Sequence, residues 1–454
     1  MHPIIIIGNG IAGVTAAREI RKLDSEVPIL MISGETDHHF SRTALMYIFM
    51  GHMNYEDTKP YEDFFWDKNR IDLLRGWVEQ VDHQNKQIVM RDGARLDYRD
   101  LVLAVGSTPN KFGWPGQDLP GAQGLYSKQD LDNLEESAKT AKRAVITGGG
   151  LIGIEMAEML LTRGIPVSFL VREKLFWGSV LPKEESIMIE KHVREHHCDL
   201  QMGEELDSIH EGPDGRVAYV TTKKGDRIDC EIVGLTAGVR PNTQWLSHNE
   251  ELEMDRGIMI DHYFQTNLPN VWSVGDCAQF RDPLPGRRPL EQVWYTGKMH
   301  GAHLAQNLVG ERKVYEPGIW WNSAKFFDIE YQTYGIVMPK PMEGEETFFW
   351  QAPKGYHTIR INYDVDTLVV KGVNVFGIRH RHQVWENWLA TKAKMPDVIA
   401  NLVAANFDPE FFKQHETSII ESWNQQHPEH KVTPNTNIKK GLFSKLLRSI
   451  QPSS

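Results

Sequence analysis

The feature that most constrains this chain is the run from Ile4 to Gly13, which reads I-I-I-I-G-N-G-I-A-G. Four consecutive isoleucines predict a strand buried on both faces, and a helix-like pattern follows at once. Gly8, Gly10 and Gly13 form a G-x-G-x-x-G fingerprint between the two elements. In such a turn the first glycine permits the bend, the second lets a pyrophosphate approach, and the third lets the helix pack closely. The helix N-terminus offers unpaired N–H groups to phosphates, so a dinucleotide site is predicted here.

The same pattern occurs a second time. Ala144 to Thr147 reads as a buried strand, and Gly148, Gly150 and Gly153 form a second fingerprint at the start of another helical pattern. Two phosphate cradles in one chain predict two bound dinucleotides.

The strand after the second fingerprint suggests which nicotinamide dinucleotide binds there. A site that prefers NAD has an acidic residue at the end of this strand, but here Val171 is followed by Arg172. A cation at this place suits the 2′-phosphate of NADPH, whereas Glu173 favours the opposite choice. The pattern therefore favours NADPH and leaves NADH open.

Composition sets the broad class. A chain of 454 residues predicts two to four domains, and a net charge of −11 argues against nucleic-acid binding. Three cysteines without a C-x-x-C spacing argue against a disulfide framework or a zinc site, and no metal site is predicted. The first strand leaves no room for a signal peptide, and no apolar run approaches the ~18 residues of a membrane span. We therefore expect a cytoplasmic protein.

Further segments extend the first half. A strand at 28–33 is followed by Glu35, whose spacing from Gly13 suits a carboxylate that binds an adenosine ribose. Residues 75–100 read as an antiparallel hairpin with its turn at 91–93. A short buried strand at 271–274 leads into Gly275-Asp276, where the aspartate could hold a polyol hydroxyl.

The composition changes from about Tyr315, where aromatic residues cluster among alternating, strand-like segments and predict a third, α+β domain. Near the end, Ile438 to Ile450 places six apolar residues on one helical face and adds four cations. That pattern suits a membrane-surface helix or a docking helix for a partner. A tail packed on its own body, or a disordered one, is equally compatible.

The predicted fold class is α/β, with two Rossmann-like dinucleotide-binding domains and a C-terminal α+β domain. The predicted boundaries are 1–112 with 243–314 for the first domain, 113–242 for the second, 315–412 for the third, and 413–454 for a linker and tail helix.

These motifs together resemble the pyridine nucleotide-disulfide oxidoreductase superfamily, in particular its ferredoxin, rubredoxin and nitrite reductase flavoproteins. The resemblance covers about residues 1–335. It rests on the two fingerprints, the A-V-G-S-T-P run from Ala104, the A-G-V-R-P-N run from Ala237 and the V-W-S-V-G-D run ending at Asp276.

The resemblance implies FAD at the first fingerprint and NAD(P)H at the second. The implied FAD-binding residues are Gly8, Gly10, Gly13, Glu35, Arg42, Ala104, Gly106 and Asp276. The implied NAD(P)-binding residues are Gly148, Gly150, Gly153, Arg172, Glu173 and Gly238. Glu155 matches a family glutamate near the nicotinamide, and Trp321 is similar to a family segment near the flavin; with Thr43 they are the predicted catalytic residues.

Thr43 marks a departure from the thiol-using branches, which carry a cysteine at this position. A hydroxyl cannot form a mixed disulfide, so disulfide reduction is not expected. The resemblance then implies an FAD-dependent oxidoreductase that passes hydride from NAD(P)H to flavin N5 and electrons to a ferredoxin- or rubredoxin-like protein.

Two alternatives remain open. The basic tail at 438–450 motivates a peripheral NAD(P)H:quinone reductase at the inner face of the membrane. A non-catalytic FAD-containing redox-sensing or assembly protein is the other. A homodimer is compatible with each of these functions.

Overall fold

The structure is a computed structural model, and it describes residues 2–408 and 410–435. The chain divides into two compact units. The first comprises Met1–Lys174 and Val193–Pro317, and the second comprises Leu175–His192 and Gly318–Ser454. The predicted tail segment at 438–450 lies outside the described residues.

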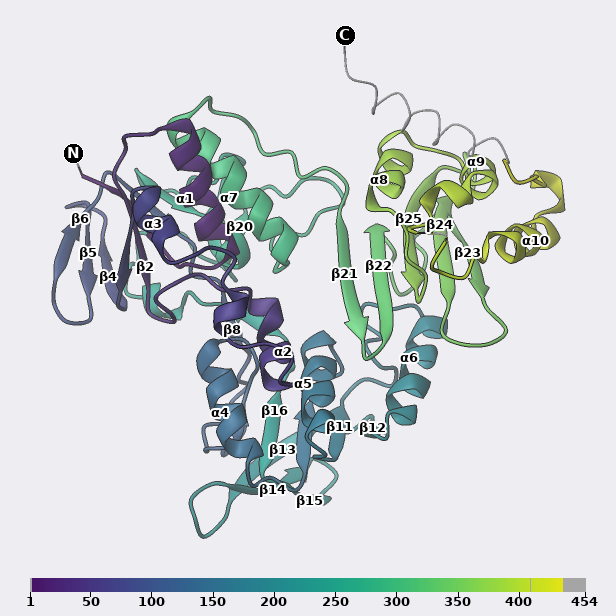
Figure 1. Ribbon diagram of the computed structural model, residues 1–454, viewed down its shortest axis with the longest axis horizontal. Helices are drawn as coiled ribbons and strands as arrows, with labels where there is room; N and C mark the ends of the chain where they lie inside the picture. The colour runs from purple at the N-terminus through teal and green to yellow at the C-terminus, as the bar shows by residue number, and fades with distance from the viewer. Residues whose placement is uncertain (1, 409, 436–454) are drawn as a thin grey trace. The chain divides into compact units, whose positions relative to one another are not determined.

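The first unit contains two parallel sheets of five strands each (Figure 1). The strands of the first sheet, in order, are β19 (Val271–Ser273), β7 (Asp100–Leu103), β1 (Ile4–Ile7), β2 (Ile29–Ser33) and β3 (Ile71–Arg75). Those of the second are β12 (Asp199–Met202), β11 (Val167–Val171), β10 (Ala144–Thr147), β16 (Ile232–Leu235) and β9 (Ala122–Gln123).

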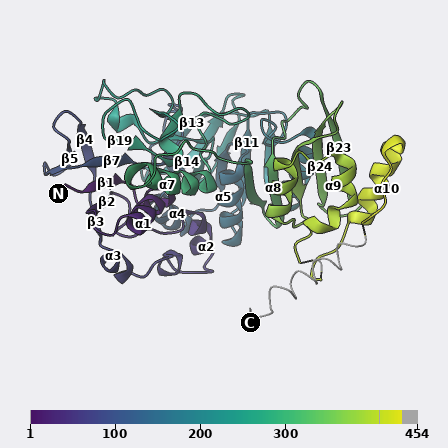
Figure 2. The ribbon, with the colours of Figure 1, turned by 90° about the horizontal axis from the view of Figure 1, so that it is seen from above.

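The central strand β1 is buried on both faces, as its four isoleucines predicted. Ile4 and Ile6 pack into a core cluster with α1 (Ile11–Leu23) and α7 (Trp294–Val309), which lie side by side in Figure 1 and Figure 2. Ile5 and Ile7 pack into a second cluster on the opposite face. Because both faces of a parallel sheet are covered, every side chain of the strand can be apolar.

Three antiparallel strands cover that opposite face, β4 (Val78–Asp82), β5 (Gln87–Met90) and β6 (Arg95–Asp97). We call the part of the unit around the sheet of β1 the first half and the part around the sheet of β10 the second half. The second half has a similar three-stranded sheet of β13 (Leu206–Glu211), β14 (Val217–Thr222) and β15 (Arg227–Asp229). Two short pairs complete the unit, β8 (Ser107–Pro109) with β17 (Val239–Pro241) and β18 (Ile258–Ile260) with β20 (Ala278–Phe280). Its other helices are α2 (Leu45–Phe49), α3 (Phe64–Lys68), α4 (Lys128–Ala138) and α5 (Leu151–Thr162).

The second unit is built on an antiparallel sheet. Its strands, in order, are β21 (Trp321–Phe326), β22 (Ile329–Gly335), β25 (Val370–Phe376), β24 (Thr358–Asp364) and β23 (Glu345–Gln351). The helices of this unit, labelled in Figure 2, are α8 (His382–Ala390), α9 (Met395–Ala400) and α10 (Glu416–Gln426). They share one core cluster with side chains of β23, β24 and β25. The predicted α/β fold class with a C-terminal α+β domain is confirmed.

Two segments differ from the predicted boundaries. Residues 416–426, assigned to a linker from the sequence, form α10 and bury Ile419, Ile420 and Trp423 in the core. Residues 175–192, assigned to the second dinucleotide-binding domain, group with the C-terminal unit; α6 (Lys183–Glu195) begins among them. Among the described residues, no helix has the length and apolar content required to cross a membrane.

Candidate functional site

The turn between β1 and α1 has the geometry that its glycines predicted. Gly8 has φ +113°, and a Cβ there would lie 2.1 Å from the carbonyl oxygen of Ala104. A Cβ on Gly13 would lie 2.1 Å from the carbonyl oxygen of Gly8, so the helix packs directly on the turn. A Cβ on Gly10, in contrast, would meet nothing within 4 Å. The space beside Gly10 is therefore open at the N-terminus of a 13-residue helix, where a pyrophosphate fits.

A cavity of about 1000 Å³ adjoins this turn. It is large enough for an extended dinucleotide, since pockets for drug-sized ligands occupy roughly 300–1,000 Å³. Its wall comes from both halves of the first unit, because Ile152 and Glu155 of α5 join residues of the first half. The predicted residues on the wall are Gly8, Gly10, Glu35, Arg42, Thr43, Ala104, Gly106, Glu155 and Asp276.

Asp276 is half-buried at the cavity wall, and two hydroxyls donate hydrogen bonds to it. Its Oδ2 accepts hydrogen bonds from Ser107 Oγ at 3.0 Å and from Tyr126 Oη at 3.2 Å. Gln292 donates in turn to Ser107 Oγ at 2.7 Å. Burial raises the pKa of Asp276, and the two hydroxyl donors partly offset this effect. Ser107 lies in the A-V-G-S-T-P run that the sequence singled out, but nothing in the sequence linked Ser107, Tyr126 or Gln292 to Asp276.

Glu35 and Arg42 form a two-point ion pair on the cavity wall. Arg42 Nη1 and Nη2 donate to the two carboxylate oxygens at 2.8 and 2.6 Å, and the backbone N–H of Lys128 donates to Oε1 at 2.9 Å. A carboxylate accepts about four hydrogen bonds, so roughly one position remains for a ribose hydroxyl. The guanidinium also lies over the ring of Tyr126, 4.6 Å from its centroid.

Glu155 brings an ionisable group to the wall from α5. Burial, with a smaller contribution from the charge of Glu158, raises its pKa to about 7. A carboxyl with this pKa can hold or release a proton near neutral pH, which suits acid–base work beside a reacting group.

No cysteine is among the described residues that line the cavity, and Thr43 lies on its wall. The three cysteines of the chain, Cys198, Cys230 and Cys277, are all buried and unpaired. Burial raises the pKa of Cys198 and of Cys230 to about 12 and also raises that of Cys277. Because the thiolate is the reactive form of cysteine, these groups are not available for thiol chemistry.

The second fingerprint repeats the geometry of the first. Gly148 has φ +112°, and a Cβ there would lie 2.7 Å from the carbonyl oxygen of Thr236. A Cβ on Gly153 would lie 2.9 Å from the carbonyl oxygen of Gly148. Gly150 caps the N-terminus of α5 in extended conformation. The backbone of the second turn thus resembles that of the first, and the binding of a phosphate there stays a prediction.

The two residues predicted to select between NADH and NADPH, Arg172 and Glu173, directly follow β11. Arg172 is exposed and donates from Nη2 to Glu173 Oε1 at 3.0 Å. Lys224 lies close by, since its Nζ donates to the carbonyl of Gly203, whose own N–H donates to the carbonyl of Glu173. Gly238 follows β16 with φ +83°.

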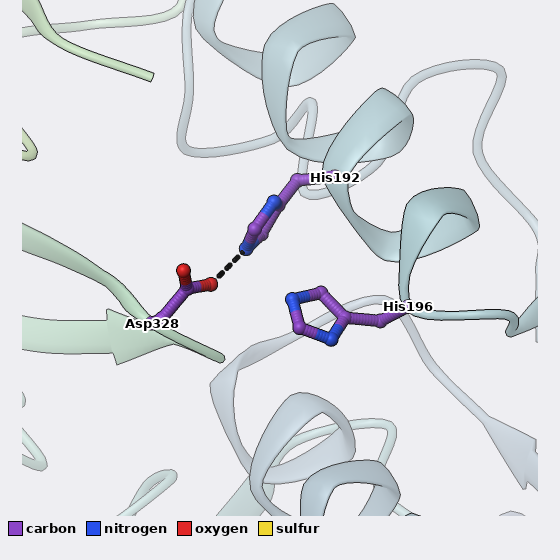
Figure 3. A group of neighbouring side chains, drawn as sticks. All are labelled: His192, His196 and Asp328. Carbon is purple, nitrogen blue, oxygen red and sulfur yellow. Dashed lines mark ion pairs between the residues drawn. The ribbon is translucent and has the colours of Figure 1, made fainter. Parts of the chain in front are cut away.

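Trp321 belongs to the second unit, where its ring packs on His382 with the centroids 4.2 Å apart. In the same unit His192 Nε2 lies 2.7 Å from a carboxylate oxygen of Asp328, as Figure 3 shows. The predicted role of Trp321 stays a prediction.

Comparisons with known proteins give the chain its family. Residues 2–307 match the family described as pyridine nucleotide-disulphide oxidoreductase. The nitrite reductase [NAD(P)H] of Bacillus subtilis (strain 168) is 27% identical over 335 residues, which cover 73% of this chain and 40% of that protein. The nitric oxide reductase FlRd-NAD(+) reductase of Vibrio vulnificus (strain CMCP6) is 28% identical over 312 residues, or 68% of this chain and 79% of that protein.

Among solved structures, a NAD-dependent persulfide reductase from A. fulgidus is similar with a TM-score of 0.81 and 21% identity, covering 94% of this chain and 84% of that one. This likeness concerns the fold alone. The chain spans about two-fifths of the length of the Bacillus nitrite reductase. With two thirds of its length matched and both fingerprints formed, the chain belongs to the pyridine nucleotide-disulphide oxidoreductase family, whose members use FAD and NAD(P)H.

Proposed function

We propose that this protein is an FAD-dependent NAD(P)H oxidoreductase that passes electrons to a ferredoxin- or rubredoxin-like protein. The observation that carries the proposal is the cavity itself. It begins at the open phosphate turn of Gly10 and reaches Ile152 and Glu155, on the helix that starts at the second fingerprint. One site is thus walled by both dinucleotide-binding halves, as hydride transfer between two dinucleotides requires.

The residues present fit an FAD molecule. The open turn at Gly10 and the N-terminus of α1 would hold the pyrophosphate, and Asp276 would bind a ribityl hydroxyl. Glu35 would use its remaining acceptor position for the adenosine ribose. When bound, FAD supplies the redox chemistry, taking a hydride from NAD(P)H and passing electrons on.

The protein itself would orient the groups that bind the cofactors and would hold a proton near the reaction. Ser107 and Tyr126 fix the carboxylate of Asp276, and Arg42 fixes that of Glu35, so both acceptors are oriented before a ligand enters. Such preorganisation reduces the cost of ordering them on binding. Glu155 would hold a proton close to the reacting end of the nicotinamide.

A protein is a better candidate than a disulfide for the electron acceptor. Disulfide reduction through this fold needs a thiolate at the cavity, and Thr43 occupies that position. The Vibrio relative is named as a reductase of FlRd, which supports a separate electron acceptor. The quinone alternative depends on the tail at 438–450, which lies outside the described residues.

NADPH is the proposed electron donor, with NADH as the competing one. The exposed guanidinium of Arg172 supports the 2′-phosphate, whereas the nearby ammonium of Lys224 is paired with Glu204. Glu173, paired with Arg172, opposes this preference. The proposed location is the cytoplasm.

Stopped-flow reduction of the FAD-loaded protein tests the proposal. We expect rapid bleaching of the flavin absorbance by NADPH, slower bleaching by NADH, and reoxidation on mixing with a ferredoxin or a rubredoxin. Protein that purifies without FAD and takes none up would refute the cofactor assignment. A reduced flavin that ferredoxins and rubredoxins both fail to reoxidise would refute the acceptor.

A further inference from the structure

Arg163 joins two helices that each contribute to the cavity wall. It caps the C-terminal end of α5, and its Nε and Nη2 both donate to the carbonyl oxygen of Phe49, at 3.1 and 2.6 Å. Its guanidinium also lies over the ring of Phe49, 3.6 Å from the centroid. Phe49 is the last residue of α2 and is 2% exposed.

A third helix meets the same side chain. Arg163 Nη2 lies 3.4 Å from a carboxylate oxygen of Glu135 on α4. The three helices α2, α4 and α5 are neighbours in Figure 1, and α2 contacts both of the others. One guanidinium is therefore shared by an element of the first half and two elements of the second.

The N-terminal ends of α2 and α5 both contribute to the cavity wall. Leu45 and Met46 of α2 line the cavity, as do Ile152 and Glu155 of α5. The wall contributed by α2 belongs to the flavin pocket, whereas α5 begins at the second fingerprint. Any change in how α2 sits against α5 changes the distance between the two cofactor sites.

The carbonyl that Arg163 binds cannot be satisfied within α2. The last carbonyl groups of a helix have no partner inside it, and α2 has only five residues. A buried carbonyl without a partner raises the free energy of the folded state. We therefore expect α2 to shift when the guanidinium is removed. The aromatic contact adds a favourable interaction that fixes the orientation of the ring.

We propose that Arg163 is a positioning residue that locks α2 onto α5 and thereby sets the distance for hydride transfer. This rests on the proposed function. It requires no contact between Arg163 and either cofactor. A misplacement of about 1 Å at a reacting centre can lower a rate by roughly 100-fold, so a loosened α2 should slow hydride transfer more than it weakens binding.

The test compares Arg163→Met with Arg163→Lys in the full-length protein. Methionine removes both donors and the charge, whereas lysine retains one donor and the cation. Arg227→Met is the matched control, because Arg227 also stacks on an aromatic ring, 3.8 Å from the centroid of Tyr219, but within the second half alone.

The first measurement is amide hydrogen exchange of residues 45–52 without added nucleotide. We expect Arg163→Met to raise exchange there at least tenfold, Arg163→Lys to restore most of the protection, and Arg227→Met to leave it unchanged. Exchange in α1 should not change in any variant. This measurement tests whether Arg163 holds α2 against α5, even if NADPH does not reduce the protein.

The second measurement separates binding from reaction. In Arg163→Met the limiting rate of flavin reduction should fall at least tenfold, while the dissociation constants of FAD and NADPH change less than threefold. An unchanged exchange rate at 45–52 would show that Arg163 does not hold α2 against α5. Faster exchange with an unchanged limiting rate of flavin reduction would show that this contact does not set the reaction geometry. A wild-type protein that neither NADPH nor NADH reduces would instead overturn the proposed function.

Discussion

The carboxyl of Glu155 provides a test that needs no bound cofactor. Burial, and to a lesser degree Glu158, raises its pKa from the ordinary 4.5 to about 7. Between these two values the unfolded chain has released the proton and the folded protein still holds it. Stability must therefore fall as the pH rises from 4.5 to 7, and the loss is complete above pH 7.

The size of the effect follows from the shift. One pKa unit corresponds to about 1.4 kcal/mol, so Glu155 should cost the fold about 1 kcal/mol at pH 5.5 and about 3 kcal/mol at pH 8. Glutamine has nearly the same shape and no charge at either pH. Glu155→Gln should thus raise the free energy of unfolding by about 2 kcal/mol more at pH 8 than at pH 5.5.

Urea unfolding of the FAD-free protein, followed by tryptophan fluorescence, measures this difference. Glu62→Gln is the control, because Glu62 is an exposed carboxyl of the same unit, and its effect should be equal at the two pH values. The reasoning about Glu155 fails if Glu155→Gln shifts stability equally at pH 5.5 and pH 8, or more at pH 5.5.

Three further outcomes are expected. Thr43→Val should leave the rate of flavin reduction by NADPH within about threefold of wild type in stopped flow, because no thiol step passes through this position; a loss of a hundredfold would show that the hydroxyl itself acts. Arg172→Ala should weaken NADPH binding about tenfold or more and NADH binding less than threefold in titrations, since it removes roughly one charge-assisted contact worth 1.5–3 kcal/mol; equal losses would argue against a 2′-phosphate site. Arg360→Met should destabilise the second unit by about 3 kcal/mol or more at pH 8 in urea unfolding, because Glu185 is fully buried and loses the donor 3.1 Å away. This loss should shrink at pH 5.5, where Glu185, whose pKa burial raises to about 7, takes up a proton.

Local sequence was sufficient for the two phosphate turns. Four isoleucines can be consecutive only where both faces of a strand are covered, and the structure buries Ile4, Ile5 and Ile6 completely. The glycine spacing then determines the turn, because a Cβ at Gly8 or Gly13 would clash with backbone. These restraints act within a few residues, so the pattern is readable without knowledge of the rest of the chain.

The surroundings of Asp276 could not be predicted in this way. Ser107 and Tyr126 reach its carboxylate from segments 169 and 150 residues away in the sequence. Serine is mostly exposed in proteins and tyrosine is intermediate, and neither position has a local pattern that marks a hydroxyl bonded to Asp276. Such pairs depend on tertiary packing, which a single sequence does not specify.

The helix α10 differs from the predicted linker for another reason. Ile419, Ile420 and Trp423 recur at helical spacing and are buried, while the residues between them are polar. This is the periodicity of an amphipathic helix packed on a core. The signal was present in 416–426, but the predicted end of the third domain at residue 412 placed this segment in a linker.

The chemical role of Arg42 depends on its partner as well as on its location. It is the one cation between His38 and Gly51, and the structure places it on the cavity wall. Its charge, however, is already matched by Glu35 through two hydrogen bonds, so the pair brings no net positive charge to a pyrophosphate. The turn at Gly10 and the dipole of α1 must then supply most of the attraction for the phosphates. FAD binding at this site should consequently depend more on the open backbone at Gly10 than on the guanidinium of Arg42.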